Sequence, residues 1–83
     1  MTDRTYAGDL GARLRERRRQ LGLTQTEVAD LADTTQRTVS QVEAGHASGV
    51  RLYLAVAEVL GLEVVLEPRE LSWSQHGADA SVP

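Results

Sequence analysis

The chain has 83 residues, which is enough for one small domain with a thin core, and it contains no cysteine. Its two histidines, His46 and His76, are far apart in the sequence, so we expect no disulfide, no metal site and no cofactor. No apolar run is long enough to span a membrane and the N-terminus lacks the apolar stretch of a signal peptide, so the sequence predicts a cytoplasmic protein with no membrane partner. We expect no enzyme, because the sequence has no clustered His–carboxylate set and no phosphate-binding glycine loop.

The formal net charge is −3, but the charge is unevenly distributed. Six arginines against three acidic residues give residues 1–20 a charge of +3, whereas residues 21–50 and 51–83 each carry −3. Nucleic-acid binding depends on the local field at the contact face. The total charge therefore does not exclude a DNA partner.

The first predicted helix runs from Asp9 to Leu21, after a loose N-terminal arm over residues 1–8. Asp9 is a suitable N-cap, and Gly22 stands where a helix commonly ends. The apolar residues that recur on one face of this helix are Leu10, Leu14 and Leu21. Its other directions carry Arg13, Arg15, Arg17, Arg18 and Arg19.

A second, short helix is predicted from Thr24 to about Ala32. Thr24 and Glu27 have the spacing of a capping box, in which each side chain binds the backbone N–H of the other residue. Its predicted apolar side consists of Val28, Leu31 and Ala32.

A three-residue break over residues 33–35 precedes a third helix from Gln36 to about Glu43, with Thr35 as its N-cap and Gly45 after its end. Val39 and Val42 are expected to face inward. The residues on the opposite face are Gln36, Arg37, Ser40 and Gln41.

A fourth helix is predicted from about Val50 to Leu60, with Ser48 as its cap and Gly61 after its end. Its expected buried residues are Val50, Tyr53, Leu54, Val56, Ala57 and Leu60. The period then changes over residues 62–67, LEVVLE, where alternation and β-branched residues predict a strand. Residues 69–83 are polar and unpatterned, and we expect a flexible tail.

Two short helices joined by a three-residue turn, the second with an outward row of glutamine and arginine, are typical of a helix-turn-helix. Arginine can bind guanine and glutamine can bind adenine through two hydrogen bonds in the major groove. The sequence therefore predicts base contacts by Gln36, Arg37 and Gln41. Ser40, between them, is short enough to let the helix approach the DNA closely.

The segment TTQRTVSQVEAG, residues 34–45, together with Thr24, Gln25, Glu27 and Ala29, resembles the Cro/cI (XRE)-type helix-turn-helix family over about residues 9–61. The resemblance implies an all-α, lambda-repressor-like bundle of four or five helices that binds operator DNA in the nucleoid. Asp33 departs from the family pattern by replacing a common glycine. Because aspartate tolerates the left-handed conformation, we expect the turn to survive.

The same resemblance implies further site residues. We also expect phosphate contacts at Ser40, Arg17 and His46 from their positions in the sequence. The resemblance itself implies phosphate contacts at Gln25 and Thr35. It also implies an ion pair between the first and third helices. The helical pattern alone leaves Arg17 and Arg18 as alternative partners of Glu43, and the resemblance favours Arg18.

A lone strand after a helical bundle lacks a pairing partner within the chain. We expect the strand, at residues 62–68 with Leu62, Val64 and Leu66 on one face, to pair with a second copy in a homodimer. The alternative is that the segment packs back on its own bundle. The ending GLEVVLEPR also resembles HipB-like antitoxins, which repress their own operon and bind a partner toxin, often a HipA-like kinase. A tail around Trp73 would then serve proteolytic turnover or pack on the dimer.

The sequence thus predicts a dimeric transcriptional repressor, the antitoxin of a toxin–antitoxin pair. A stand-alone phage-type regulator without a toxin is one alternative. The other is a protein-interaction module that has lost DNA binding, which the acidic net charge would allow.

Overall fold

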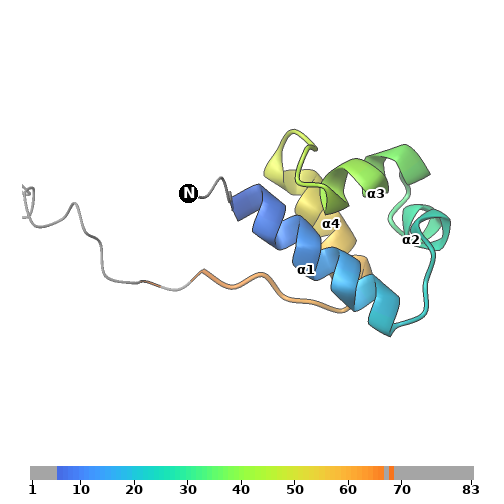
Figure 1. Ribbon diagram of the computed structural model, residues 1–83, viewed down its shortest axis with the longest axis horizontal. Helices are drawn as coiled ribbons and strands as arrows, with labels where there is room; N and C mark the ends of the chain where they lie inside the picture. Colours follow the sequence, from blue (N-terminus) through green and yellow to red (C-terminus); the bar gives the residue numbers. More distant parts are fainter. Residues whose placement is uncertain (1–5, 67, 69–83) are drawn as a thin grey trace, which may run out of the picture.

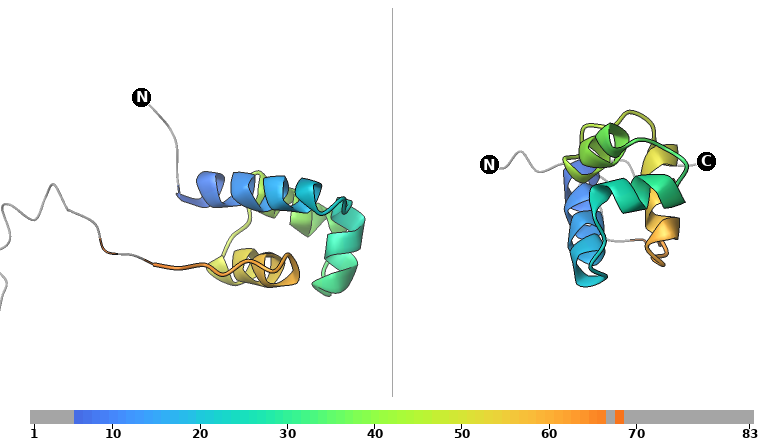
Figure 2. Two further views of the ribbon diagram at one scale, coloured as in Figure 1. Left: turned by 90° about the horizontal axis from the view of Figure 1, so that it is seen from below. Right: turned by 90° about the vertical axis from the view of Figure 1, so that its right-hand side faces the viewer.

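Four α-helices follow one another in the computed structural model, which describes residues 6–66 and 68. They are α1 (Tyr6–Gln20), α2 (Gln25–Leu31), α3 (Gln36–Glu43) and α4 (Val50–Val59) (Figure 1). Figure 2 shows α1 and α4 running alongside each other, with α2 lying across one end of both. Helix α3 packs against each of the other three helices, so its inner face is fixed by the whole bundle.

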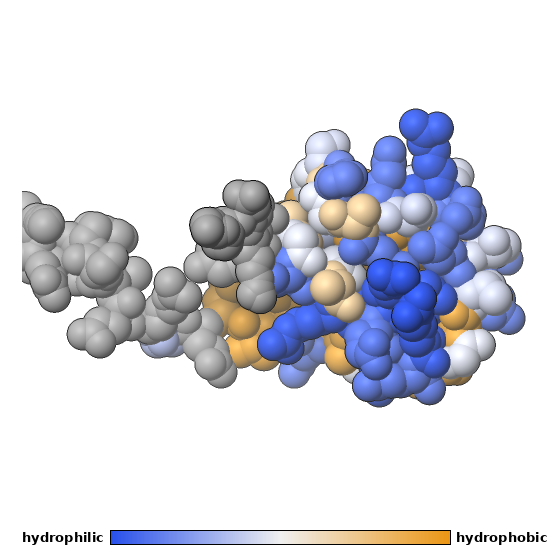
Figure 3. Space-filling model, in the orientation of Figure 1, coloured by the Kyte–Doolittle hydropathy of each residue, from blue (hydrophilic) through white to orange (hydrophobic). Residues whose placement is uncertain are grey.

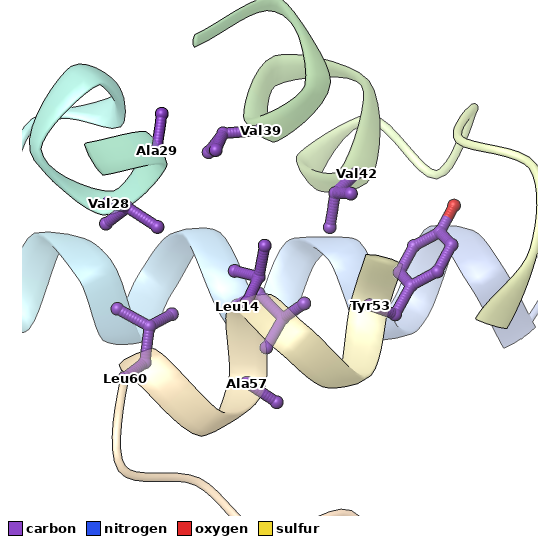
Figure 4. Close-up of a cluster of buried hydrophobic side chains, with 9 residues drawn as sticks. Leu14, Val28, Ala29, Val39, Val42, Tyr53, Ala57 and Leu60 are labelled. Atoms are coloured by element: carbon purple, nitrogen blue, oxygen red, sulfur yellow. The ribbon is translucent and has the colours of Figure 1, made fainter. Parts of the chain in front are cut away.

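All four helices, together with the residue that follows α4, contribute to one apolar core (Figure 4). Its buried members are Leu14, Val28, Ala29, Val39, Val42, Tyr53, Val56, Ala57 and Leu60. Val28, Val39 and Val42 have no exposed surface, which ties α2 and α3 to a single relative orientation. The prediction that Val39 and Val42 face inward is confirmed.

Several residues expected in the core are exposed instead. Leu21 lies beyond the last turn of α1. Leu31 forms the end of α2, whose buried residues are Val28 and Ala29. On α4, Val50 and Leu54 are 64% and 44% exposed, because the other helices of this one chain cover a different side of α4. The apolar stripe of α4 is therefore wider than the surface that the bundle covers.

The four helices end in the same way. After each one, a residue with positive φ is followed by a backbone N–H that bonds back five residues, for example Thr34 N–H to the Ala29 carbonyl at 2.9 Å. Glycine holds the positive-φ position after α1, α3 and α4, whereas Asp33 holds it after α2, with φ of 57°. The expectation that Asp33 keeps the turn intact is confirmed.

One predicted helix start was wrong. Helix α1 begins at Tyr6 and not at Asp9, so residues 6–8 are helical and Asp9 lies in the first turn. The extra turn is held by tertiary packing. Ala7 contacts the core, and Gly8 lies so close to Gly45 that a Cβ on Gly45 would be 2.7 Å from the Cα of Gly8. Residues 1–5 of the predicted arm lie outside the described residues.

At α4 the predicted cap was also wrong. The N-cap of this helix is Gly49, with φ of 87°, and it makes no side-chain capping bond. Ser48, which the sequence indicated as the cap, is an exposed residue of the preceding loop. A glycine with positive φ turns the chain into α4 directly, so no hydroxyl is placed to accept a bond from the first turn.

The segment after α4 runs back past α1 without forming a strand within the described residues. Leu62 packs against the core, whereas Val64, Val65 and Leu66 are exposed, and Figure 3 shows apolar surface along this side of the molecule. A groove of about 550 Å³ separates the segment from α1. The structure contains a single copy of the chain, so a strand that pairs with a second copy has no partner in it, and the strand stays a prediction. Glu67 and the predicted tail lie outside the described residues.

None of the helices described here combines the length and the apolar character that crossing a bilayer requires. Nor do three histidine, cysteine or acidic side chains gather into a possible metal site anywhere in the described part of the chain.

Candidate nucleic-acid interface

Helices α2 and α3 form a compact pair whose starts are both capped by threonine. The Glu27 N–H donates to Thr24 Oγ1 at 3.0 Å and the Thr24 N–H donates to Glu27 Oε1 at 2.8 Å, which confirms the capping box. At α3, the Thr38 N–H donates to Thr35 Oγ1 at 3.1 Å, which confirms Thr35 as the N-cap. These caps fix where each helix begins and therefore which side chains of α3 point outward.

The outer face of α3 is polar and open to solvent. It carries Gln36, Arg37, Ser40 and Gln41, all of which are exposed. The side chains of Arg37 and Gln41 have no hydrogen-bond partner within the described part of the chain. Because the opposite face is buried valine, α3 is a rigid rod that presents free donors and acceptors to a ligand.

Behind this face, a buried ion pair joins α3 to α1. Arg18 Nε donates to Glu43 Oε2 at 2.6 Å, and Arg18 Nη2 donates to Glu43 Oε1 at 3.1 Å. The two side chains are only 12% and 4% exposed. Arg18 also donates to the Leu23 carbonyl at 2.8 Å, so one guanidinium connects α1, the following loop and α3.

Arg17, the alternative partner, lies elsewhere. Its Nε donates to the Leu60 carbonyl at 3.1 Å, at the end of α4. A cation at a helix C-terminus interacts favourably with the partial negative charge of the last carbonyl groups.

The ion pair continues outward through two glutamines. Gln25 Nε2 donates to Glu43 Oε1 at 3.0 Å, and Gln36 Nε2 donates to Gln25 Oε1 at 2.5 Å. A chain of hydrogen bonds thus runs from the interior to the first residue of α3. The sequence indicated Gln25 only as a phosphate contact, and its bond to Glu43 was missed because the two residues are 18 positions apart.

Glu43 stays ionised in spite of its burial. Burial alone would raise the pKa of its carboxyl, but hydrogen bonds from Arg18 and Gln25, with the nearby charges of Arg18 and Arg15, lower the pKa below its usual value. The bond to Glu43 raises the pKa of Arg18, more than offsetting the effect of burial. The pair is therefore fully charged at neutral pH.

The arginines of α1 divide between two sides of the molecule. Arg15 and Arg19, both exposed, line a hollow of about 410 Å³ together with Arg18, Gln25, Ser40 and Glu43. Arg13 and Arg17 line the groove beside residues 62–65. Arg15 and Arg19 were missed as individual site residues, although their four-residue spacing, on one helix face, is a usable signal.

The other expected phosphate contacts lie at different ends of α3. Thr35 is exposed at the start of the helix, where its hydroxyl donates to Thr38 Oγ1 at 3.0 Å. Ser40 is exposed at the hollow. His46 is exposed after the end of α3, where its backbone N–H closes the helix on the Gln41 carbonyl at 2.8 Å.

A comparison with protein families agrees with this geometry. The model of a helix-turn-helix family matches residues 14–66, which is more than half of the chain. The chain belongs to this family. It is an XRE-type helix-turn-helix protein, a DNA-binding transcription regulator whose partner is double-stranded DNA. Helices α2 and α3 are the two helices of the motif, and the row on α3 lies where such proteins present side chains to the major groove.

Proposed function

We propose that this helix-turn-helix protein is a sequence-specific repressor in which Gln36, Arg37 and Gln41 read bases. The observation that carries the proposal is the exposed row on α3, held rigid by buried valines and free of internal partners at Arg37 and Gln41. These side chains have the donors and acceptors that guanine and adenine require in the major groove.

Phosphate contacts by Gln25, Thr35 and Ser40 complete the proposed interface. All three lie beside the base-reading row, at the starts of α2 and α3 or at the hollow between α1 and α3. Such contacts set the register of α3 on the duplex. Arg17 is left out because its guanidinium lies at the end of α4, and His46 is kept only as a contact beyond the far end of α3.

We propose further that the active form is a homodimer closed by residues 62–66. Val64, Val65 and Leu66 are 41%, 63% and 92% exposed, an arrangement that favours coverage by another chain. Pairing of this segment with its copy would hide these side chains and the unpaired backbone. Two copies of α3 would then read half-sites about 34 Å apart or a multiple of that distance.

The HipB-like resemblance of GLEVVLEPR supports an antitoxin role, in which the dimer represses its own operon and binds a HipA-like kinase. Co-expression with a HipA-like kinase, taken from a gene adjacent to this one, tests this part alone. Recovery of a stable complex supports the antitoxin, whereas separate elution of the two proteins leaves a stand-alone regulator.

DNA reading is tested by selecting bound duplexes from a random-sequence pool. The full-length wild type is expected to enrich a two-fold symmetric motif, and Arg37→Ala is expected to lose preference at one base pair in each half-site. Arg51→Ala, which removes an exposed arginine from α4, is the matched control and should select the wild-type motif. A pool without any enriched motif would refute sequence-specific binding.

Sizing by light scattering tests the dimer. The wild type is expected to have twice the mass of one chain, and Val64→Lys is expected to give the monomer. A monomeric wild type that still binds DNA would refute the closing role of residues 62–66.

A further inference from the structure

We infer that Glu43, whose side chain is only 4% exposed, sets which base Gln36 reads by fixing the orientation of two side-chain amides. The inference rests on the proposed base reading by α3 and assigns a positioning role to Glu43, which acts through Gln25. It follows from the chain of hydrogen bonds that joins these residues.

The Glu43 carboxylate determines which end of the Gln25 amide faces it. An ionised carboxylate only accepts hydrogen bonds, whereas a glutamine amide has one end that accepts and one that donates. Facing Glu43 Oε1 at 3.0 Å, Gln25 must present its NH₂. Its oxygen is therefore turned outward, away from the core.

The same rule applies at the next step. The outward oxygen of Gln25 only accepts, so Gln36 must present its own NH₂ to it, as the 2.5 Å contact from Gln36 Nε2 shows. One N–H and the oxygen of Gln36 are left for DNA, in a fixed order along the groove. That order matches adenine, where the N–H donates to N7 and the oxygen accepts from the N6 amino group.

Arg18 fixes which end of the side chain at position 43 faces Gln25, and so sets the direction of the hydrogen bonds from Glu43 through Gln25 to Gln36, which we call the relay. Arg18 donates to both oxygens of Glu43, with the shorter bond, 2.6 Å, on Oε2. In Glu43→Gln the oxygen of the new amide is expected to keep the shorter bond from Arg18 Nε, because a guanidinium cannot accept, and the longer bond from Arg18 Nη2 is lost. The NH₂ then faces Gln25, whose amide must reverse, and Gln36 reverses in turn, so that its oxygen meets N7 of adenine, acceptor against acceptor.

The test compares full-length variants on operator duplexes taken from the random-pool selection. Wild type is expected to prefer adenine at the Gln36 position by roughly 5- to 150-fold, as for other two-bond contacts. Glu43→Gln is expected to lose at least about tenfold of this preference, while the preference at the Arg37 position stays unchanged. Glu58→Gln, which removes the same charge from the exposed side of α4, is the matched control.

A second variant keeps the test decisive if Glu43→Gln does not fold. Gln25→Ala leaves the buried pair intact and frees the Gln36 amide, so the adenine preference is expected to fall about three- to tenfold through lost order alone. Combining Glu43→Gln with Gln36→Ala should cause no further loss of preference beyond Gln36→Ala.

The outcomes separate the relay from the proposed function. If the variants bind every duplex more weakly by the same factor and keep the wild-type preference at each position, Glu43 is only structural and the inference is overturned. If wild type selects no motif at all, base reading itself fails.

Discussion

Arg18→Met removes the cation that compensates the most buried charge of the bundle while keeping most of the apolar stem. Glu43, which is 4% exposed in the wild type, would be left with only the Gln25 N–H as a hydrogen-bond donor, and the Leu23 carbonyl would lose its 2.8 Å bond. Breaking one member of a buried pair costs about 3–5 kcal/mol. A domain of this size has a total stability of roughly 4–12 kcal/mol, so the variant should be close to unfolding at room temperature.

Urea denaturation followed by circular dichroism measures this loss at pH 7. Arg13→Met, an exposed arginine on the same helix, is the control and should change the free energy of unfolding by no more than about 0.5 kcal/mol. The double variant Arg18→Met with Glu43→Leu should recover much of the stability, because it leaves no unpaired charge. A cost below about 1 kcal/mol for Arg18→Met would refute the reasoning.

The pH dependence provides a second check on the same pair. The pKa of Glu43 is lowered in the folded state, so its contribution is fully present above the usual glutamate pKa of about 4.3 and is lost as the pH falls through the lower folded pKa. In Arg18→Met, burial dominates and raises the pKa of Glu43, so this variant gains stability on acidification. The two stability curves should therefore converge below about pH 4, and parallel curves would contradict this account.

Three further predictions concern single positions. Arg37→Ala should lose about 1–3 kcal/mol of binding free energy and relax preference at one base pair; equal weakening on all duplexes would make it a phosphate contact. Gly11→Ala should prevent close packing of α1 on α3, since a Cβ there would lie 2.3 Å from the Val42 carbonyl oxygen, and thermal melting should show a loss of more than about 2 kcal/mol. Arg19→Ala should reduce the slope of log K against log salt by about 0.9, whereas Arg13→Ala, on the groove side, should leave it unchanged.

The helices that the sequence predicts best are those with local signals. The capping box of Thr24 and the cap of Thr35 depend on residues three positions apart, so the pattern of the chain contains all the information that sets where α2 and α3 begin. The end of α2 is equally local, because Asp33 needs only a left-handed conformation that its own side chain tolerates.

Features that depend on distant residues were not predictable in the same way. The first turn of α1 is stabilised by the close contact between Gly8 and Gly45, and residues 1–8 contain no periodic pattern that predicts this contact. The helical pattern of α1 also places its arginines in several directions around the helix without showing which side of the molecule each one faces. Which side each one takes is decided by the partners that packing brings near, such as the Leu60 carbonyl for Arg17.

The arginines of α1 lie on two sides of the molecule, and this explains how a chain of net charge −3 can belong to a DNA-binding family. Arg18 neutralises Glu43, so the hollow beside Ser40 retains the uncompensated charges of Arg15 and Arg19 close to the outer face of α3. A phosphate within one Debye length, about 8–10 Å, senses this local excess far more than the acidic residues beyond it. Binding strength should therefore follow the arginines of this hollow, and charge changes on the far side of α4 should alter solubility more than affinity.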